Sequence, residues 1–136
     1  MSEIKKTKKL FIEGAITPQF IADSIAKHST KTDIGAHQIF LGQIRADVIN
    51  AQTVKAIEFN AYNEMCEEEY YTIREMIFAQ YQLSCMHVYH SLGRINAGEI
   101  NLFVFVSSIH RKDAIEACAE MVEHIKTKLP IFGKEI

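Results

Sequence analysis

The chain is poor in the residues that mark disulfide frameworks, collagen-like repeats and low-complexity linkers. Its 136 residues include three cysteines, two prolines, six glycines and no tryptophan. The cysteines, Cys66, Cys85 and Cys118, are odd in number and show no CxxC spacing, which argues against a disulfide framework and against a zinc site. Free cysteines are typical of a reducing compartment, so we expect a cytoplasmic protein.

An excess of charge of one sign is also missing. Lysine and arginine number 15, and aspartate and glutamate number 17, which gives a formal net charge of −2. Because nucleic-acid-binding domains are usually basic, the lysines at positions 5, 6, 8 and 9 are interpreted as a solvated leader or edge strand rather than an anion-binding arm. No apolar run approaches the roughly 20 residues of a membrane-spanning helix, and no secretory signal is present. We therefore expect neither nucleic acid nor a membrane as partner.

The composition that remains is that of one globular domain. Hydrophobic residues make up 48% of the chain and charged residues 24%. A domain of this size buries roughly two thirds of its unfolded surface and can form a stable core without disulfides or structural metals. Since no repeat, low-complexity tract or linker divides the sequence, residues 1–136 are predicted to form a single domain.

Hydrophobic periodicity predicts an α+β fold in which helices segregate from mostly antiparallel strands. Helices are expected at about 18–28, 63–81 and 112–128, and strands at 36–44, 55–61, around 86–88 and at 100–106. Thr17 and Pro18 form a start signal for the first helix, and Gly42 inside the first strand predicts a bulge or a close backbone approach. Asp113 and Glu116 fit a capping box for the last helix, and Ser107 or Ser108 is a competing start.

The helices carry apolar stripes that predict their buried faces. The predicted inward residues are Phe20, Ile21 and Ile25 in the first helix; Cys66, Tyr70, Ile73, Ile77 and Tyr81 in the second; and Ile115, Cys118, Val122, Ile125 and Leu129 in the third.

Cationic residues follow two apolar strands and suggest an anion site. Arg45 comes after the first strand, and His110 and Arg111 stand between a strand and the start of the last helix. Helix N-termini and arginine side chains both suit phosphate oxygens. One interpretation is that these three residues converge on an anionic ligand, and the other is that they are separate surface charges.

Lysines near the C-terminus are further candidates. Lys126 lies at the edge of the apolar stripe of the last helix, where a lysine is either partly desolvated, which suits proton transfer or covalent chemistry, or extends its head into water. Lys128 points away from that edge. Lys134 follows Gly133 in a short tail that is either a ligand-binding loop or a frayed end.

Other reactive residue types show no functional spacing. His87, Tyr89 and His90 lack a carboxylate at metal-ligand spacing and are interpreted as structural, while His28, His37 and His124 are isolated and receive no role. No P-loop or nucleophile elbow is present. Cys66 and Cys118 lie on apolar helix faces and are interpreted as inert packing residues.

Four segments resemble a known family: GAHQIFLGQIRAD, IEFNAYNEM, HSLGRINAGEINLFVFVSSIHRKDAIEAC and HIKTKLPIFGKE. In order and spacing they are similar to the large (catalytic) subunit of molybdopterin synthase, the MoaE family, over about residues 35–136. The resemblance implies an α/β hammerhead fold with an antiparallel subdomain. It also implies a longer C-terminal tail, since members of the family usually continue beyond this point.

The resemblance implies a sulfurtransferase that needs neither a metal nor a cofactor of its own. Such enzymes insert two sulfurs into cyclic pyranopterin monophosphate and form the dithiolene of molybdopterin, a step of molybdenum cofactor biosynthesis. The sulfur comes from a thiocarboxylate on the C-terminal Gly-Gly of a small ubiquitin-like partner subunit. Two large subunits form a dimer at the centre of a heterotetramer, and the strand at 100–106 is a candidate edge for that dimer.

The family's functional residues map onto matching positions of this chain. Gln43, Ile44 and Arg45 match a substrate-contacting loop, His110 and Arg111 match a pair placed for the substrate phosphate and pterin, and Lys126 matches a catalytic lysine. The family's second lysine falls at Gly133, so Lys134 is the candidate to replace it, with Glu135 beside it. His90-Ser91 departs from the family's usual His-Arg.

The absence of a lysine at position 133 keeps a second interpretation open. The chain is then a non-catalytic module, derived from the same fold, that binds an anion or a ubiquitin-like tail and has a regulatory role.

Overall fold

The computed structural model describes residues 10–136, so the lysines at positions 5, 6, 8 and 9 lie outside the described part of the chain. The elements, in chain order, are β1 (Phe11–Glu13), α1 (Pro18–His28), β2 (Ala36–Gln43), β3 (Val48–Ile49), β4 (Gln52–Thr53), β5 (Ala56–Ala61), α2 (Asn63–Gln80), β6 (Cys85–Asn96), β7 (Ile100–Ser108), α3 (Arg111–Lys128) and β8 (Ile131–Glu135). No described helix combines the length and apolar character needed to cross a membrane.

The main sheet has the strand order β2-β7-β6-β5-β8, and every neighbouring pair on this path is antiparallel. β1 adds a parallel pairing to β6, and β3 and β4 form a separate hairpin. The antiparallel sheet and its separate helices confirm the predicted α+β class.

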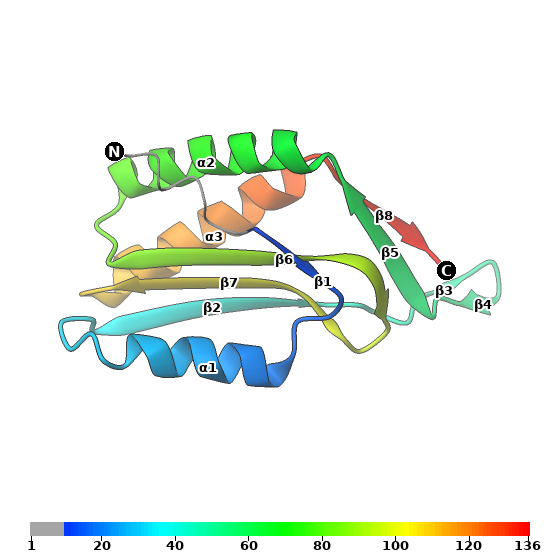
Figure 1. The fold of residues 1–136 in the computed structure, drawn as a ribbon, viewed down its shortest axis with the longest axis horizontal. Helices are drawn as coiled ribbons and strands as arrows, with labels where there is room; N and C mark the ends of the chain where they lie inside the picture. The colour runs from blue at the N-terminus through cyan, green and yellow to red at the C-terminus, as the bar shows by residue number, and fades with distance from the viewer. Residues whose placement is uncertain (1–9) are drawn as a thin grey trace.

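β6 joins two parts of the sheet because its two halves have different partners. Cys85 to His90 pair with β7, whereas Gly93 to Asn96 pair with β5. As a result β5 and β8 extend at an angle from the layer formed by β2, β7 and β6 (Figure 1). The cavity described below lies where these two parts meet.

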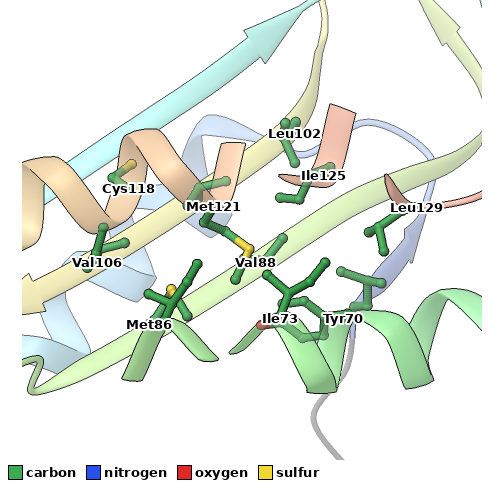
Figure 2. Close-up of a cluster of buried hydrophobic side chains, with 14 of the residues drawn as sticks. Tyr70, Ile73, Met86, Val88, Leu102, Val106, Cys118, Met121, Ile125 and Leu129 are labelled. Atoms are coloured by element: carbon green, nitrogen blue, oxygen red, sulfur yellow. The ribbon is translucent and has the colours of Figure 1, made fainter. Parts of the chain in front are cut away.

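Helices cover both faces of the β2-β7-β6 layer, with α2 and α3 on one side and α1 on the other (Figure 1). Successive side chains of β7 point to opposite faces of the sheet, and both faces are apolar. Leu102, Val104 and Val106 pack in the larger core, and Phe103 and Phe105 face α1. Figure 2 shows the larger core, in which Met86, Val88 and Leu102 lie among Tyr70 and Ile73 of α2 and Met121 and Ile125 of α3.

The three predicted helices are confirmed with small changes at their ends. Thr17 caps α1 by accepting a hydrogen bond from the Phe20 backbone N–H at 3.1 Å. The Asp113–Glu116 capping box is wrong, since α3 begins at Arg111 after His110 and Asp113 instead accepts a hydrogen bond from Gln82 N–H. Two predicted inward residues are also exposed, Ile25 by 39% and Ile115 by 48%.

The predicted strands at 36–44, 55–61 and 100–106 are confirmed as β2, β5 and β7, and the strand predicted around 86–88 lies within the longer β6. The interruption predicted at Gly42 is a register shift between Gly42 and Gln43 in the β2–β7 ladder. β1, the β3–β4 hairpin and β8 were not predicted, and the tail that the sequence left open between loop and frayed end is strand β8.

Candidate functional site

A cavity of about 560 Å³ lies where the end of β2, strands β5 and β8 and the last turn of α3 come together. Its apolar wall is formed by Val54, Ile57, Phe59, Ile125, Leu129 and Ile131. Polar and charged groups are placed around that wall: Gln43, Arg45, Asp47, His90, Asn101, Lys126 and Glu135. The lining is thus polar and apolar in comparable measure, and an apolar wall with convergent polar groups is the usual form of a small-molecule site.

The segment after β2 is directed to the cavity by the bulge at Gly42 and Gln43. Ile44 is buried, its N–H donates to Glu99 O at 3.0 Å, and its carbonyl accepts from Gly98 N–H at 2.8 Å. The turn between β6 and β7 therefore holds Ile44 in place and leaves Gln43 and Arg45 exposed on either side of it. The substrate loop predicted from the sequence thus lies at the cavity.

Arg45 is the guanidinium at the cavity rim. Its side chain is 83% exposed, and Nε lies 3.3 Å from a carboxylate oxygen of Asp47. An exposed ion pair of this kind contributes little to stability, so the planar guanidinium can exchange Asp47 for another oxyanion at small cost. This arrangement suits a phosphate group at the rim.

Lys126 lies in the last turn of α3 and lines the same cavity. It is exposed, so the structure decides between the two interpretations of its place at the edge of the apolar stripe. The ammonium group reaches water rather than a desolvated interior. The helix C-terminus also favours a cation there.

His90 is a cavity residue that the sequence interpretation treated as structural. It is 5% exposed, and its Nδ1 lies 2.8 Å from the carbonyl oxygen of Ser91. Burial lowers the pKa of His90, the positive charge of Lys126 lowers it further, and the hydrogen bond to Ser91 acts in the opposite direction. The ring is therefore neutral near pH 7 with its hydrogen on Nδ1, and Nε2 is left as an acceptor.

The alternation of side chains along β8 separates Lys134 from the cavity. Ile131 and Glu135 line the cavity, so Gly133, midway between them, faces it too. Lys134 lies on the opposite face of the sheet, beside its cross-strand partner Glu58. The expectation that Lys134 takes the place of the family's second lysine therefore meets a geometric obstacle, because one residue along a strand reverses the side.

His110 and Arg111 do not reach the cavity of their own chain. They lie at the start of α3, whereas Lys126 lies in its last turn. Arg111 and Lys126 are fifteen positions apart along the helix, which corresponds to about 22 Å. The hypothesis that Arg45, His110 and Arg111 converge is thus not met within one protomer.

The thiols of two buried cysteines are poor nucleophiles. Burial raises the pKa of Cys66 to about 11, with a further contribution from Glu67, and burial raises the pKa of Cys118 to about 11. Both side chains are neutral thiols near pH 7. This agrees with their interpretation as packing residues and leaves the cavity dependent on other groups for nucleophilic chemistry.

Comparison with known proteins places this architecture in a family. A sequence model of the MoaE protein family matches residues 16–128, which include α1 through α3. This chain belongs to the MoaE family. The match ends at Lys128, so β8 with Gly133, Lys134 and Glu135 lies beyond the matched range.

Relatives of this MoaE-family chain include the molybdopterin synthase catalytic subunit of Pyrococcus abyssi, to which it is 31% identical over 136 residues. The alignment covers 100% of this chain and 84% of the archaeal protein. The chain spans about half, 52%, of the length of its rice relatives.

Solved structures show the same fold. The structure of molybdopterin synthase from Staphylococcus aureus matches with a TM-score of 0.78 and 27% identity, covering 93% of this chain and 89% of that one. A complex of subunits 1 and 2 of molybdopterin-converting factor from Helicobacter pylori matches with a TM-score of 0.80 and 18% identity, over 93% of this chain and 82% of that one. The second likeness concerns the fold alone.

Proposed function

We propose that this chain is the catalytic subunit of a molybdopterin synthase, a sulfurtransferase that converts cyclic pyranopterin monophosphate into molybdopterin. The observation that carries the proposal is the meeting of Arg45, His90 and Lys126 at one cavity in a MoaE-family chain. An aromatic heterocycle with a phosphate group suits this combination, because the ring packs on Ile57 and Phe59 while the cations bind the phosphate.

The cavity residues that the family resemblance identified have distinct roles in this proposal. Arg45 binds the phosphate, and Gln43 and Ile44 shape the rim beside it. Lys126 stabilises negative charge on the reacting groups or transfers a proton. Glu135 lies on the opposite wall, where it accepts hydrogen bonds from a pterin.

The sulfur is supplied by a partner protein. Cys66 and Cys118 are un-ionised, and the Helicobacter pylori structure of the same fold is a complex of two different subunits. We propose a small ubiquitin-like subunit whose C-terminal Gly-Gly ends in a thiocarboxylate. Both proteins then act in a reducing compartment such as the cytoplasm, where thiols persist.

The chemistry balances without a cofactor. The thiocarboxylate sulfur attacks a side-chain carbon of the pterin that carries an oxygen; as the new C–S bond forms, the C–O bond breaks and the oxygen leaves with its electron pair and takes up a proton. The partner is then joined to the substrate through an acyl–sulfur bond. Water then cleaves this acyl–sulfur bond, and the partner leaves as a carboxylate while sulfur stays on the product. In this proposal the ammonium of Lys126, which lines the cavity, stabilises the anion in both steps, and a second thiocarboxylate repeats them for the second sulfur.

His110 and Arg111 enter this scheme through a second copy of the chain. We propose a dimer in which the start of α3 of one protomer reaches the cavity of its partner. The dimer edge expected from the sequence, the strand at 100–106, is unsuitable because β7 lies between β2 and β6. β2 is instead an edge strand of the described sheet, next to β7, and it carries the exposed apolar residues Phe40 and Leu41. Two such protomers with two small subunits form the expected heterotetramer.

Reconstitution tests the proposal directly. Cyclic pyranopterin monophosphate is titrated into the protein by calorimetry, with and without the thiocarboxylated small subunit, and dithiolene product is then measured. Binding followed by product only in the presence of the thiocarboxylated partner supports the enzyme. Substrate binding without any product would contradict it.

A non-catalytic regulatory module is the second candidate, and Gly133 favours it. Where the family resemblance places a second lysine, this chain presents a bare backbone to the cavity. Such a module binds the pterin or the Gly-Gly tail and releases no product, so the same reconstitution distinguishes it from the enzyme.

A further inference from the structure

We propose that His28, Cys85 and His87 form a binding site for a zinc ion, on the face of the sheet opposite the catalytic cavity. The three ligand atoms all lie within 4.8 Å of one another. His28 Nε2 and His87 Nε2 are 3.1 Å apart although 59 positions separate the residues along the chain. The sequence interpretation had found no zinc site, because the ligands come from two distant segments.

Local structure explains why the three side chains meet. Cys85 and His87 alternate on β6 and therefore share one face, the face that Tyr89 uses to pack against α1. His28 is the last residue of α1, and its ring lies over Phe105 with centroids 4.7 Å apart. His28 and Cys85 are each 8% exposed, and His87 is half-buried.

The tautomer of His28 is the one that a zinc ligand needs. Its Nδ1 lies 2.8 Å from the backbone carbonyl of Ser24, which can only accept, so Nδ1 carries the hydrogen. In the neutral ring Nε2 then accepts the 3.1 Å hydrogen bond from His87 Nε2, and zinc would replace the hydrogen that His87 Nε2 donates. A hydrogen bond from the second ring nitrogen to a backbone carbonyl is the usual support of a zinc-bound histidine.

The spacing is close to that of tetrahedral coordination. Zn–N and Zn–S bond lengths place two nitrogens about 3.3 Å apart, and a nitrogen and a sulfur about 3.6 Å apart. The two histidine nitrogens, 3.1 Å apart, are already close to this separation. The Cys85 sulfur lies within 4.8 Å of both nitrogens, so a change of its side-chain rotamer is enough to bring it to bonding distance. Two imidazoles and a thiolate favour zinc over magnesium or calcium, which prefer oxygen.

An ion can also enter. A cavity of about 940 Å³ lies between α1 and the sheet, and both His28 and His87 line it. It offers a route from solvent and leaves the fourth position for water. Because the ligands join α1 to β6, binding stabilises the folded state by mass action.

Metal titration tests the site without reference to catalysis. The untagged protein is stripped with a chelator and titrated with Co²⁺, whose thiolate charge-transfer absorption reports a cobalt–sulfur bond, and Zn²⁺ is then added in competition. We expect one equivalent of Co²⁺ with that absorption, displaced by Zn²⁺. Cys85→Ala should abolish the absorption, and Cys85→Ala and His28→Gln should each weaken Zn²⁺ binding by more than about tenfold.

Matched controls are available in the same chain. Cys118→Ala removes a buried cysteine that is not a proposed ligand, and His124→Gln removes a histidine of α3 that is not a proposed ligand. Both variants should bind Co²⁺ and Zn²⁺ as the wild type does. Wild-type protein that takes up no Co²⁺ or Zn²⁺, or whose binding survives Cys85→Ala, would overturn the proposal. Should the variants fold poorly, thermal unfolding of the wild type decides: zinc should raise its Tm relative to chelator, and an unchanged Tm refutes the site.

Discussion

Gly133 stands directly opposite Phe59 in the β5–β8 ladder, and a Cβ atom built on Gly133 would lie 3.1 Å from Phe59 Cε1. The same Cβ would lie 3.0 Å from Ile57 Cγ2. Both neighbours are cavity-lining side chains. The glycine therefore keeps one wall of the cavity free of charge at the position where the family resemblance places a lysine.

Gly133→Lys should raise turnover severalfold, because it adds a second ammonium group to the cavity. The packing of its Cβ against Ile57 and Phe59 should lower the free energy of unfolding by about 1 kcal/mol. Product formation with the thiocarboxylated partner and urea unfolding measure the two effects. Gly133→Met is the control of similar length, and equal turnover of the two variants would show that the added charge has no role.

Lys126→Ala should abolish nearly all dithiolene formation, a loss on the order of 100-fold or more, while partner binding persists. The reason is that Lys126 is the ammonium group at the cavity, whereas the wall at Gly133 carries none. Lys128→Ala removes an exposed lysine of the same helix turn and should retain wild-type turnover. Activity of Lys126→Ala within a few-fold of wild type would remove Lys126 from the mechanism.

Lys126→Ala and Arg111→Ala should complement each other if the start of α3 serves the cavity of a partner protomer. Each variant alone should be nearly inactive. In a randomly mixed dimer half of the molecules are hybrids with one intact site, so about a quarter of wild-type activity should return. Mixtures that stay inactive would place both residues in the site of the same chain, or neither.

The stability of the protein should fall in mild acid because of His90. Folding lowers the pKa of His90 below the usual 6.5, so the unfolded chain binds more protons between the two pKa values. The stabilisation is therefore fully present above pH 6.5 and is lost as the pH falls through the folded pKa. Urea unfolding at about pH 7.5 and about pH 5.5 measures the difference.

His90→Gln should flatten that pH dependence, since it removes the titrating group. His110→Gln is the matched control, because His110 is an exposed histidine at the N-cap position of α3 whose side chain makes no capping hydrogen bond. The assignment to His90 is refuted if the wild type and His90→Gln lose equal stability between the two pH values.

Local sequence signals predicted the elements whose stability is local. The Thr17-Pro18 cap located α1, and the alternating apolar residues of β7 located a strand that is covered on both faces. The stripe of α2 was correct at Cys66, Tyr70, Ile73 and Ile77. The prediction that Ile25 and Ile115 point inward was wrong, because helical periodicity identifies the buried face of a helix but not its width. Each of the two residues lies at the edge of the buried face.

The parts that sequence could not predict depend on distant partners. β8 is a short segment with a glycine at its centre, and it forms a strand because β5 offers it an edge. Arg45 and Lys126 were identified as single residues, but their meeting at one cavity required the fold. His90 and the pair of His28 and His87 carried no spacing signal, since tertiary contacts alone define their surroundings.

The bulge at Gly42 and Gln43 places a constraint on the length of the chain in this region. Gly42 pairs with Leu102 and Gln43 with Ile100, so Asn101 of β7 is the extra residue, and deleting it would restore a regular ladder and turn the preceding side chains of β7 to the opposite face. The turn at Gly98 and Glu99 would then shift relative to β2, and Ile44 would lose its two hydrogen bonds to that turn. Evolution can therefore vary the composition of this segment more freely than the number of its residues.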